Sequence, residues 1–198
     1  MNKILIASGN SHKQKKLKVI VKRYFKPIIL SLPKIQEQGH SFRQIAEDKA
    51  KKYSLWFDGW AVATDAGAII PALKKWDALR TRRFVSGADK ERINKLLQLM
   101  KGKKNRHIYW HEAVAVANKG KIIFSVLTTA MPAILEKRYN QDYYEAGHWL
   151  DSLCYFPKFK KNFFELNKKE RLAVENSWTK IKTSFNRYFQ SYKTIKNK

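Results

Sequence analysis

The first half of the chain alternates between short apolar runs and segments in which apolar residues recur at helical spacing. Runs of about four to eight apolar residues bounded by turn residues are typical of buried strands, whereas recurrence at intervals of about three and four residues is typical of an amphipathic helix. The predicted strands cover residues 3–8, 27–32 and 60–64, and Gly67 is expected to follow the turn after the third strand. The predicted helices cover residues 11–25, 41–56 and 88–101.

The second half of the chain adds a hairpin and a final helix. Two apolar stretches within residues 107–129 are joined by the turn sequence NKGK, which is typical of a β-hairpin, and residues 168–190 have the spacing of a helix. Strands that alternate with helices and are followed by a hairpin indicate an α/β fold with a central mixed β-sheet flanked by helices. We therefore expect a single domain over residues 1–192, followed by a basic tail at 193–198.

Chain length and cysteine content narrow the class of protein. The 198 residues include no uncharged apolar run of about 18 residues, and the N-terminal apolar stretch is too short for a secretory signal. The single cysteine, Cys154, excludes an internal disulfide framework and a cysteine-rich zinc site, and it fits a reducing compartment. We therefore predict a cytoplasmic protein with no membrane span, in which Cys154 is a buried packing residue and not a nucleophile.

The charge of the chain is unusual. Forty-one Lys and Arg residues oppose sixteen Asp and Glu residues, which gives a formal charge of +25. Such a charge attracts nucleotides, nucleic acids and other polyanions without choosing among them, and ordinary enzymes of organisms with lysine-rich proteomes also carry it. Nucleic-acid binding is therefore one hypothesis, for which aromatic residues interleaved with the basic C-terminal stretch offer stacking surfaces, although such residues at helical spacing more often form a core. They are Phe159, Phe163, Phe164, Trp178, Phe185 and Tyr188.

The turn Ser8-Gly9-Asn10 joins the first predicted strand to the first predicted helix, for which we expect Ser11 as the N-cap. Glycine permits close approach of a ligand to the backbone, and the N–H groups and dipole at a helix start favour an anion. Lys13 lies in the first helical turn, where its charge opposes that dipole, and a bound anion would remove the conflict. Considered alone, the segment fits a common turn and a basic surface helix better than a phosphate site.

The spacing of two carboxylates and a second lysine indicates a candidate functional site. Lys49 stands twelve residues after Glu37 and sixteen before Asp65. Considered singly, Glu37 fits a solvated loop residue and Lys49 a surface residue of a helix. Asp65 likewise fits a polar residue that closes a strand and caps the next turn. Only the joint spacing of the three distinguishes a functional site from these plain alternatives.

Motifs along the chain resemble those of the inosine triphosphate pyrophosphatase family, also called the Ham1-like family. SGNSHK is similar to the family's T-G-N-x-x-K, EQGHSF to E-x-G-x-T-F, and AVATDAG to A-D-D-S-G, and the spacing of the last two needs no gap. The later segments RRFVSG, CYFPKF and FFELNKKER resemble A-R-Y-x-G, G-Y-D-P-x-F and A-E-L-x-x-E-E-K. The resemblance spans nearly the whole chain and is most specific over residues 4–67, so we interpret the protein as a diverged member of this family.

The resemblance implies an elongated sheet, a reaction and a set of roles. Family members hydrolyse non-standard purine nucleoside triphosphates to a monophosphate and pyrophosphate, and they usually form homodimers. Mg²⁺ prefers carboxylate and phosphate oxygens, so Glu37 and Asp65 are the predicted metal ligands, and Asp65 would also activate the attacking water. Lys13 and Lys49 would act on the phosphates as catalytic cations. The other predicted substrate contacts are Ser8, Gly9, Asn10, Gly67, Arg83 and Tyr155.

Departures from the family pattern concentrate where the base would be recognised. The motif G-F-G-Y-D-P is here SLCYFP, which keeps the tyrosine and proline but neither glycine nor the aspartate, and the family's S-H-R aligns with residues 175–177. Within A-D-D-S-G, the first acid is Thr64 here and the serine is Ala66. We therefore expect that the residues for phosphate and metal binding are retained, and that the base specificity is altered or loose. The alternative is a catalytically weak member that acts as a basic nucleotide- or nucleic-acid-binding protein.

Three further features have plain structural explanations. Tyr155 fits a core tyrosine as well as a residue that stacks on a base, and Arg83 lies in the basic run RTRR, which fits a solvated face equally well. His107 and His111 stand four residues apart, but no third ligand is evident, and the motif lacks the glutamate placement of a zinc-protease helix. We therefore expect no zinc site at this histidine pair.

Overall fold

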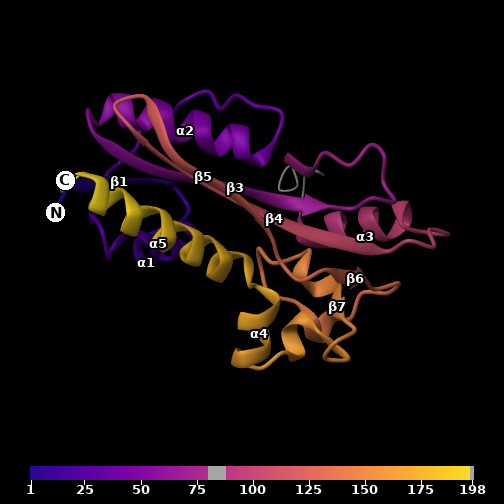
Figure 1. The fold of residues 1–198 in the computed structure, drawn as a ribbon. Coiled ribbons are helices and arrows are strands. Elements are labelled where there is room, and N and C mark those ends of the chain that lie inside the picture. The colour runs from indigo at the N-terminus through magenta and orange to yellow at the C-terminus, as the bar shows by residue number, and fades with distance from the viewer. Residues whose placement is uncertain (80–87, 197–198) are drawn as a thin grey trace. The chain divides into compact units, whose positions relative to one another are not determined.

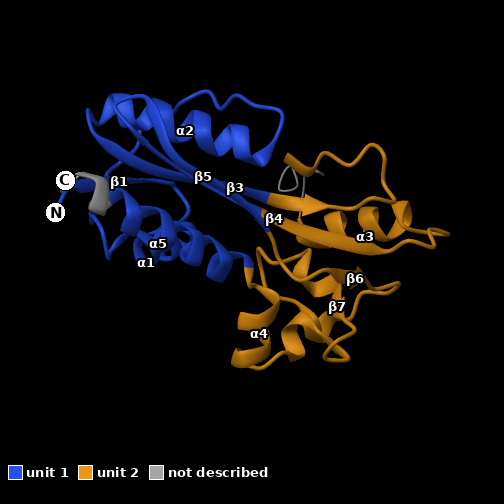
Figure 2. Ribbon diagram, viewed as in Figure 1, with its two compact units in different colours: residues 1–66, 112–128, 177–198 blue, residues 67–111, 129–176 orange. Residues whose placement is uncertain are grey.

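The structure is a computed structural model that describes residues 1–79 and 88–196, with side chains described up to residue 192. The chain forms two compact units (Figure 2). Unit 1 comprises residues 1–66, 112–128 and 177–198, and unit 2 comprises residues 67–111 and 129–176. Strands β3 (Trp60–Ile69) and β4 (His107–Asn118) contribute residues to both units.

Unit 1 is a mixed sheet with helices on both faces (Figure 1). Strand β1 (Lys3–Ala7) pairs in parallel with β2 (Lys26–Ile28) and with β3, and β5 (Lys121–Thr129) pairs with β4. Helix α2 (Phe42–Trp56) covers one face, and α1 (Ser11–Val21) and α5 (Ser177–Lys196) lie side by side on the other. Their apolar faces form a core that fixes the end of β1 and the start of α1. Its members include Ile4, Ile6, Leu17, Val62, Phe185 and Phe189.

Unit 2 is an antiparallel ladder packed with short helices. The first residues of β4 pair with β6 (Ala133–Leu135), which pairs with β7 (Cys154–Phe156), and β7 pairs with β8 (Lys161–Asn162). The α-helices of this unit are α3 (Asp89–Leu99) and α4 (Lys168–Val174), and 3-10 helices cover Gln141–Tyr143, Asp151–Leu153 and Phe163–Glu165. Its separate core includes Ile93, Leu96, Ile108, Leu135, Leu153 and Phe156.

The structure confirms the mixed sheet flanked by helices, and it confirms the hairpin as β4 and β5. The strand predicted over residues 27–32 is shorter than expected, because only Lys26–Ile28 pair with β1. The turn predicted after residue 64 is wrong, since β3 continues to Ile69 and holds Gly67 within the strand. A polar Asp-Ala-Gly sequence suggested a turn, but backbone pairing carries the strand through it.

The single helix predicted over residues 168–190 is also wrong. Helix α4 ends at Val174, the following Glu175 has φ −83° and ψ 27°, and α5 starts at Ser177. Helical spacing of apolar residues on either side of this break explains the prediction, because periodicity alone does not locate a boundary. Helix α5 then continues to Lys196, beyond the predicted domain boundary at residue 192.

Two expectations about side chains can be compared directly with the structure. Cys154 is buried as predicted, and burial raises the pKa of its thiol well above the ordinary value, which makes it a poor nucleophile. Phe185 is fully buried in unit 1, so it belongs to a core and is not a stacking surface. None of the helices in the described ranges is long and apolar enough to cross a membrane.

Candidate active site

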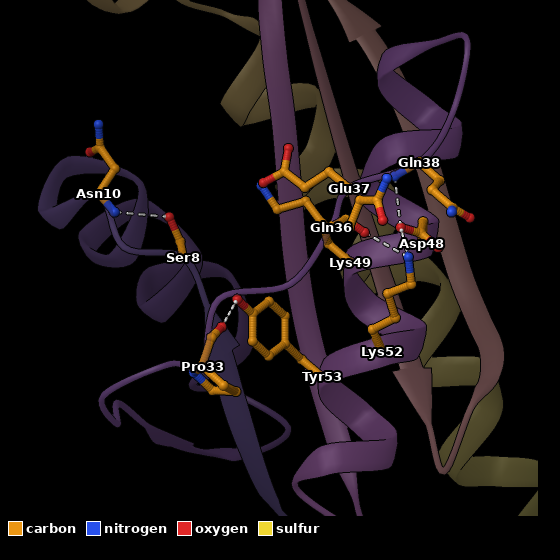
Figure 3. Close-up of polar contacts among 10 residues, drawn as sticks. All are labelled: Ser8, Asn10, Pro33, Gln36, Glu37, Gln38, Asp48, Lys49, Lys52 and Tyr53. Atoms are coloured by element: carbon orange, nitrogen blue, oxygen red, sulfur yellow. Dashed lines mark hydrogen bonds and ion pairs between the residues drawn. The ribbon is translucent and has the colours of Figure 1, made fainter.

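The turn between β1 and α1 is organised by its own side chains. Asn10 is the N-cap of α1, because its backbone is extended (φ −91°, ψ 119°) and its Oδ1 accepts hydrogen bonds from the backbone N–H groups of His12 and Lys13. The prediction of Ser11 as N-cap is therefore wrong, since Ser11 is already the first helical residue. The buried Ser8 accepts a hydrogen bond through Oγ from the Asn10 N–H at 3.3 Å (Figure 3). The turn thus holds Lys13 at the first turn of the helix.

Removing the cap is expected to cost stability and to disturb this turn. Asn10→Ala leaves the N–H groups of His12 and Lys13 without their acceptor, so the free energy of unfolding should fall by about 1 kcal/mol, measured by urea denaturation. Asn167→Ala is a matched control, because Asn167 caps α4 of unit 2 in the same manner. Both variants should lose stability, but only Asn10→Ala should also weaken nucleotide binding. Equal nucleotide binding by both variants would contradict a role for this turn.

The loop that carries Glu37 is fastened along helix α2 (Figure 3). Tyr53 donates a hydrogen bond through its hydroxyl to the Pro33 carbonyl at 2.9 Å, and Lys52 Nζ donates to the Gln36 carbonyl at 2.7 Å. At the end of this stretch Glu37 Oε1 lies 3.1 Å from Lys49 Nζ. The Lys49 side chain is 16% exposed and that of Glu37 is 50% exposed, so this ion pair joins a mostly buried lysine to a half-exposed glutamate.

Asp65 lies on β3, and its carboxyl group is mostly buried. Its Oδ2 atom is inaccessible to solvent and has no hydrogen-bond partner. Burial raises the pKa of Asp65 above the ordinary value, while the nearby ammonium groups of Lys13 and Lys49 oppose that rise. Glu37 also acts on this carboxyl, so the structure brings Lys13, Glu37, Lys49 and Asp65 into one electrostatic neighbourhood in unit 1.

A fifth ionisable residue of this neighbourhood, Glu112, was not among the predicted site residues. It lies on β4, is 9% exposed and accepts from the hydroxyl of Thr64 at 2.5 Å. Burial raises the pKa of Glu112 to about 7, opposed by Lys13, by the hydrogen bond with Thr64 and by Lys16. The sequence offered one indication of this residue, because it is the only charged residue within the apolar run EAVAVA.

The remaining predicted site residues lie in other segments. Gly67 and Tyr155 belong to unit 2, where Tyr155 is partly buried on β7 and pairs with Ile134 of β6 and Asn162 of β8. Gly9 lies in the turn before α1, where added side-chain bulk would meet no atom within 4 Å. Arg83 lies outside the described residues.

The donor set of unit 1 fits one divalent cation only partly. Within the described residues, no cluster of three or more His, Cys, Asp or Glu side chains could hold a metal ion. However, the buried Oδ2 of Asp65 is an anionic oxygen with no hydrogen-bond partner, and a hard cation would supply the missing partner. A cation bound there would complete its coordination with oxygens other than side-chain carboxylates, such as those of a phosphate or of water.

Comparisons with known proteins show the family and the fold of this chain. A model of the Ham1 family matches residues 4–177. The chain belongs to the Ham1 family. A solved structure of a Ham1 protein from Coxiella burnetii superposes with a TM-score of 0.78 at 22% identity, covering 94% of this chain and 100% of that one, which shows the shared Ham1 fold.

Curated proteins of other organisms are also similar to this Ham1 member in sequence. A dITP/XTP pyrophosphatase of Synechocystis is 27% identical over 183 residues, which cover 89% of this chain and 90% of that protein. A dITP/XTP pyrophosphatase of Protochlamydia amoebophila is 27% identical over 195 residues, which cover 93% and 94%. Within the family motif A-D-D-S-G, Asp65 itself is kept, whereas Thr64 stands where the motif has an acid and Ala66 where it has serine.

Proposed function

We propose that this protein hydrolyses nucleoside triphosphates to a nucleoside monophosphate and pyrophosphate, with non-standard purine nucleotides such as dITP and XTP as substrates. Such an activity would remove unwanted nucleotides from the cellular pool. The observation that carries the proposal is the grouping of Lys13, Glu37, Lys49 and Asp65 in unit 1 of a Ham1-family chain. The names of the curated relatives support the reaction and the substrate class.

The lysines would bind the triphosphate. Lys13 is presented by the first turn of α1, next to the capped turn of Ser8 and Asn10, and its ammonium would neutralise phosphate oxygens. Lys49 is paired with Glu37 at 3.1 Å. An incoming phosphate would compete for that ammonium and release the Glu37 carboxylate. The hydroxyl of Ser8 and the amide of Asn10 would add neutral donors at the same turn.

The carboxylates would hold a cation and the attacking water. Mg²⁺ is the proposed cofactor, bound by Asp65 and by the carboxylate that Glu37 frees, and it would supply charge neutralisation and a more acidic water. Asp65 would hold the cation through its unpaired Oδ2 and would take up the proton of the attacking water through its other carboxyl oxygen. A raised pKa suits this role, because a carboxylate with a raised pKa is a stronger base than an ordinary one.

Measurement of pyrophosphate release tests the proposal. We expect the protein to release pyrophosphate from dITP, ITP and XTP in Mg²⁺, and to lose the activity when EDTA removes the metal. Analysis of the second product separates this cleavage from the stepwise loss of phosphate, since only α–β cleavage yields a monophosphate and pyrophosphate directly. The absence of pyrophosphate from every purine triphosphate in the presence of Mg²⁺, Mn²⁺ or Co²⁺ would overturn the proposal.

Base selectivity is proposed to be weak. The SLCYFP segment lacks the glycines and the aspartate of the family motif, and Tyr155 is its remaining candidate for stacking on a base. A site without matched donors for a 6-keto purine discriminates poorly between bases. The homodimer, the cytoplasmic location and nucleic-acid binding through the basic surface remain predictions from the sequence. The charge of +25 and the aromatic residues interleaved with the basic C-terminal stretch are the support for nucleic-acid binding.

A further inference from the structure

Glu112 and Thr64 form a buried pair between adjacent strands of unit 1. Thr64 is 1% exposed and Glu112 is 9% exposed. The Thr64 hydroxyl lies 2.5 Å from Glu112 Oε1 and 2.7 Å from the carbonyl oxygen of Ala113. A hydroxyl has one proton to donate. When Glu112 is ionised, the Thr64 hydroxyl can therefore make a full hydrogen bond to only one of these two oxygen acceptors. The pair therefore fixes the Glu112 carboxyl group against the residue that precedes Asp65.

The same carboxyl group shares a cation with Asp65. Lys13 opposes the raised pKa of Glu112 and also that of Asp65, so its positive charge acts on two carboxyl groups on neighbouring strands. Lys16 of α1 acts on Glu112 as well. Among the described residues, Lys13 forms no ion pair with either carboxyl group. Its ammonium is thus placed near both acids without being engaged by one of them.

Packing alone does not explain an acid at residue 112. A buried carboxyl group costs stability once it ionises, and the neighbouring residues of β4 are apolar, from Ala113 to Ala117. Acids held in such unfavourable surroundings near a charge of opposite sign concentrate at functional sites. The Ham1 pattern has an acid at position 64, where this chain carries threonine, and Glu112 contacts that very residue from the next strand.

We propose that Glu112 is a positioning residue of this site, and that β4 supplies through it the second carboxyl group that residue 64 of β3 lacks. The inference rests on the proposed pyrophosphatase function. Glu112 acts through Lys13. Because two carboxyl groups attract the one ammonium group of Lys13, this ammonium does not form an ion pair with Asp65 alone. Lys13 therefore stays available to phosphate, and Asp65 stays available to the cation and the water.

The test compares four proteins in steady-state pyrophosphate release: wild type, Glu112→Gln, the double variant Thr64→Asp with Glu112→Gln, and the control Glu136→Gln. Glutamine keeps the shape of Glu112 and can donate to Thr64, but it leaves Lys13 to Asp65 alone. We expect kcat of Glu112→Gln to fall by about 10- to 100-fold and KM to rise, because Lys13 then pairs with Asp65 and is less available to phosphate. The double variant returns an acid to β3 and should recover at least about a third of the lost kcat.

Glu136 is the matched control because burial also raises its pKa, but it lies in unit 2. Its variant should retain wild-type kinetics. Calorimetric binding of an α,β-methylene triphosphate analogue gives a readout without turnover, and Glu112→Gln should bind it more weakly than wild type does. A merely structural Glu112 would instead lower the melting temperature of the variant at pH 8.

Each outcome decides one question. If wild type releases no pyrophosphate, the proposed function fails, whatever the variants do. If wild type is active, the inference is overturned by unchanged kcat or unchanged KM in Glu112→Gln, by a lower melting temperature at pH 8, or by no recovery in the double variant. Reduced kcat with weaker binding, an undiminished melting temperature at pH 8 and recovery by Thr64→Asp supports it.

Discussion

Replacing Asp65 with asparagine is expected to lower kcat for pyrophosphate release by about 10³-fold without unfolding the protein. Asparagine has the same shape as aspartate, but its neutral amide neither accepts a proton from water nor holds a divalent cation as a carboxylate does. The structure gives this carboxyl group a buried Oδ2 with no hydrogen-bond partner and places Lys13 and Lys49 near it. The loss should therefore appear in kcat and in metal affinity more than in binding of the triphosphate.

The same substitution should not destabilise the fold. Burial raises the pKa of Asp65, which means that the folded state disfavours its ionised form at neutral pH. A neutral side chain removes that penalty, so the melting temperature of Asp65→Asn at pH 7.5 should equal or exceed that of wild type. Asp58→Asn is the control, because Asp58 pairs with Lys119 at 3.1 Å on the surface of unit 1 and should keep full activity. Activity of Asp65→Asn within about tenfold of wild type would exclude a role for Asp65 in catalysis.

Local pattern was sufficient to predict the elements that carry the N-terminal part of the candidate site. An apolar run predicted β1, and helical spacing predicted α1 and α2, because each of these elements buries one face that the sequence displays directly. Motif spacing then brought Glu37, Lys49 and Asp65 into one hypothesis. In the structure Glu37 pairs with Lys49, and both act on Asp65, but their roles in binding and catalysis stay predictions.

The pairing of Thr64 with Glu112 could not be predicted from the sequence. These residues are 48 positions apart, and they meet only because β3 and β4 are neighbours in the sheet. No local sequence pattern predicts which strands become adjacent in the sheet or in which register they pair. The extension of β3 through Asp65 and Gly67 was missed for a related reason. A polar residue and a glycine favour a turn locally, whereas pairing with neighbouring strands is a tertiary effect that overrides this preference.

Glu112 should make the stability of the protein fall as pH rises from about 4.5 to about 7. Its pKa is raised from the ordinary value of 4.5 to about 7 in the folded state, chiefly by burial. Below pH 4.5 both states hold the proton, so the residue has no effect. Between the two values the unfolded chain has released the proton while the folded chain retains it, so unfolding becomes easier with each pH increment. The full penalty, about 3 kcal/mol, applies above pH 7.

Unfolding of wild type and Glu112→Gln by urea at pH 4.5, 6 and 8 measures this penalty. The variant should match wild type at the lowest pH and exceed its free energy of unfolding by up to about 3 kcal/mol at the highest. Glu170→Gln provides a control of opposite sign, because the Asn167 N–H and Lys161 lower the pKa of Glu170. Its stabilising effect is present above the unfolded pKa and is lost as pH falls, so this variant should differ from wild type at pH 8 and converge with it in acid. A difference between Glu112→Gln and wild type that does not change with pH would mean that the Glu112 carboxyl titrates as an exposed group, and that the buried pair with Thr64 does not form in solution.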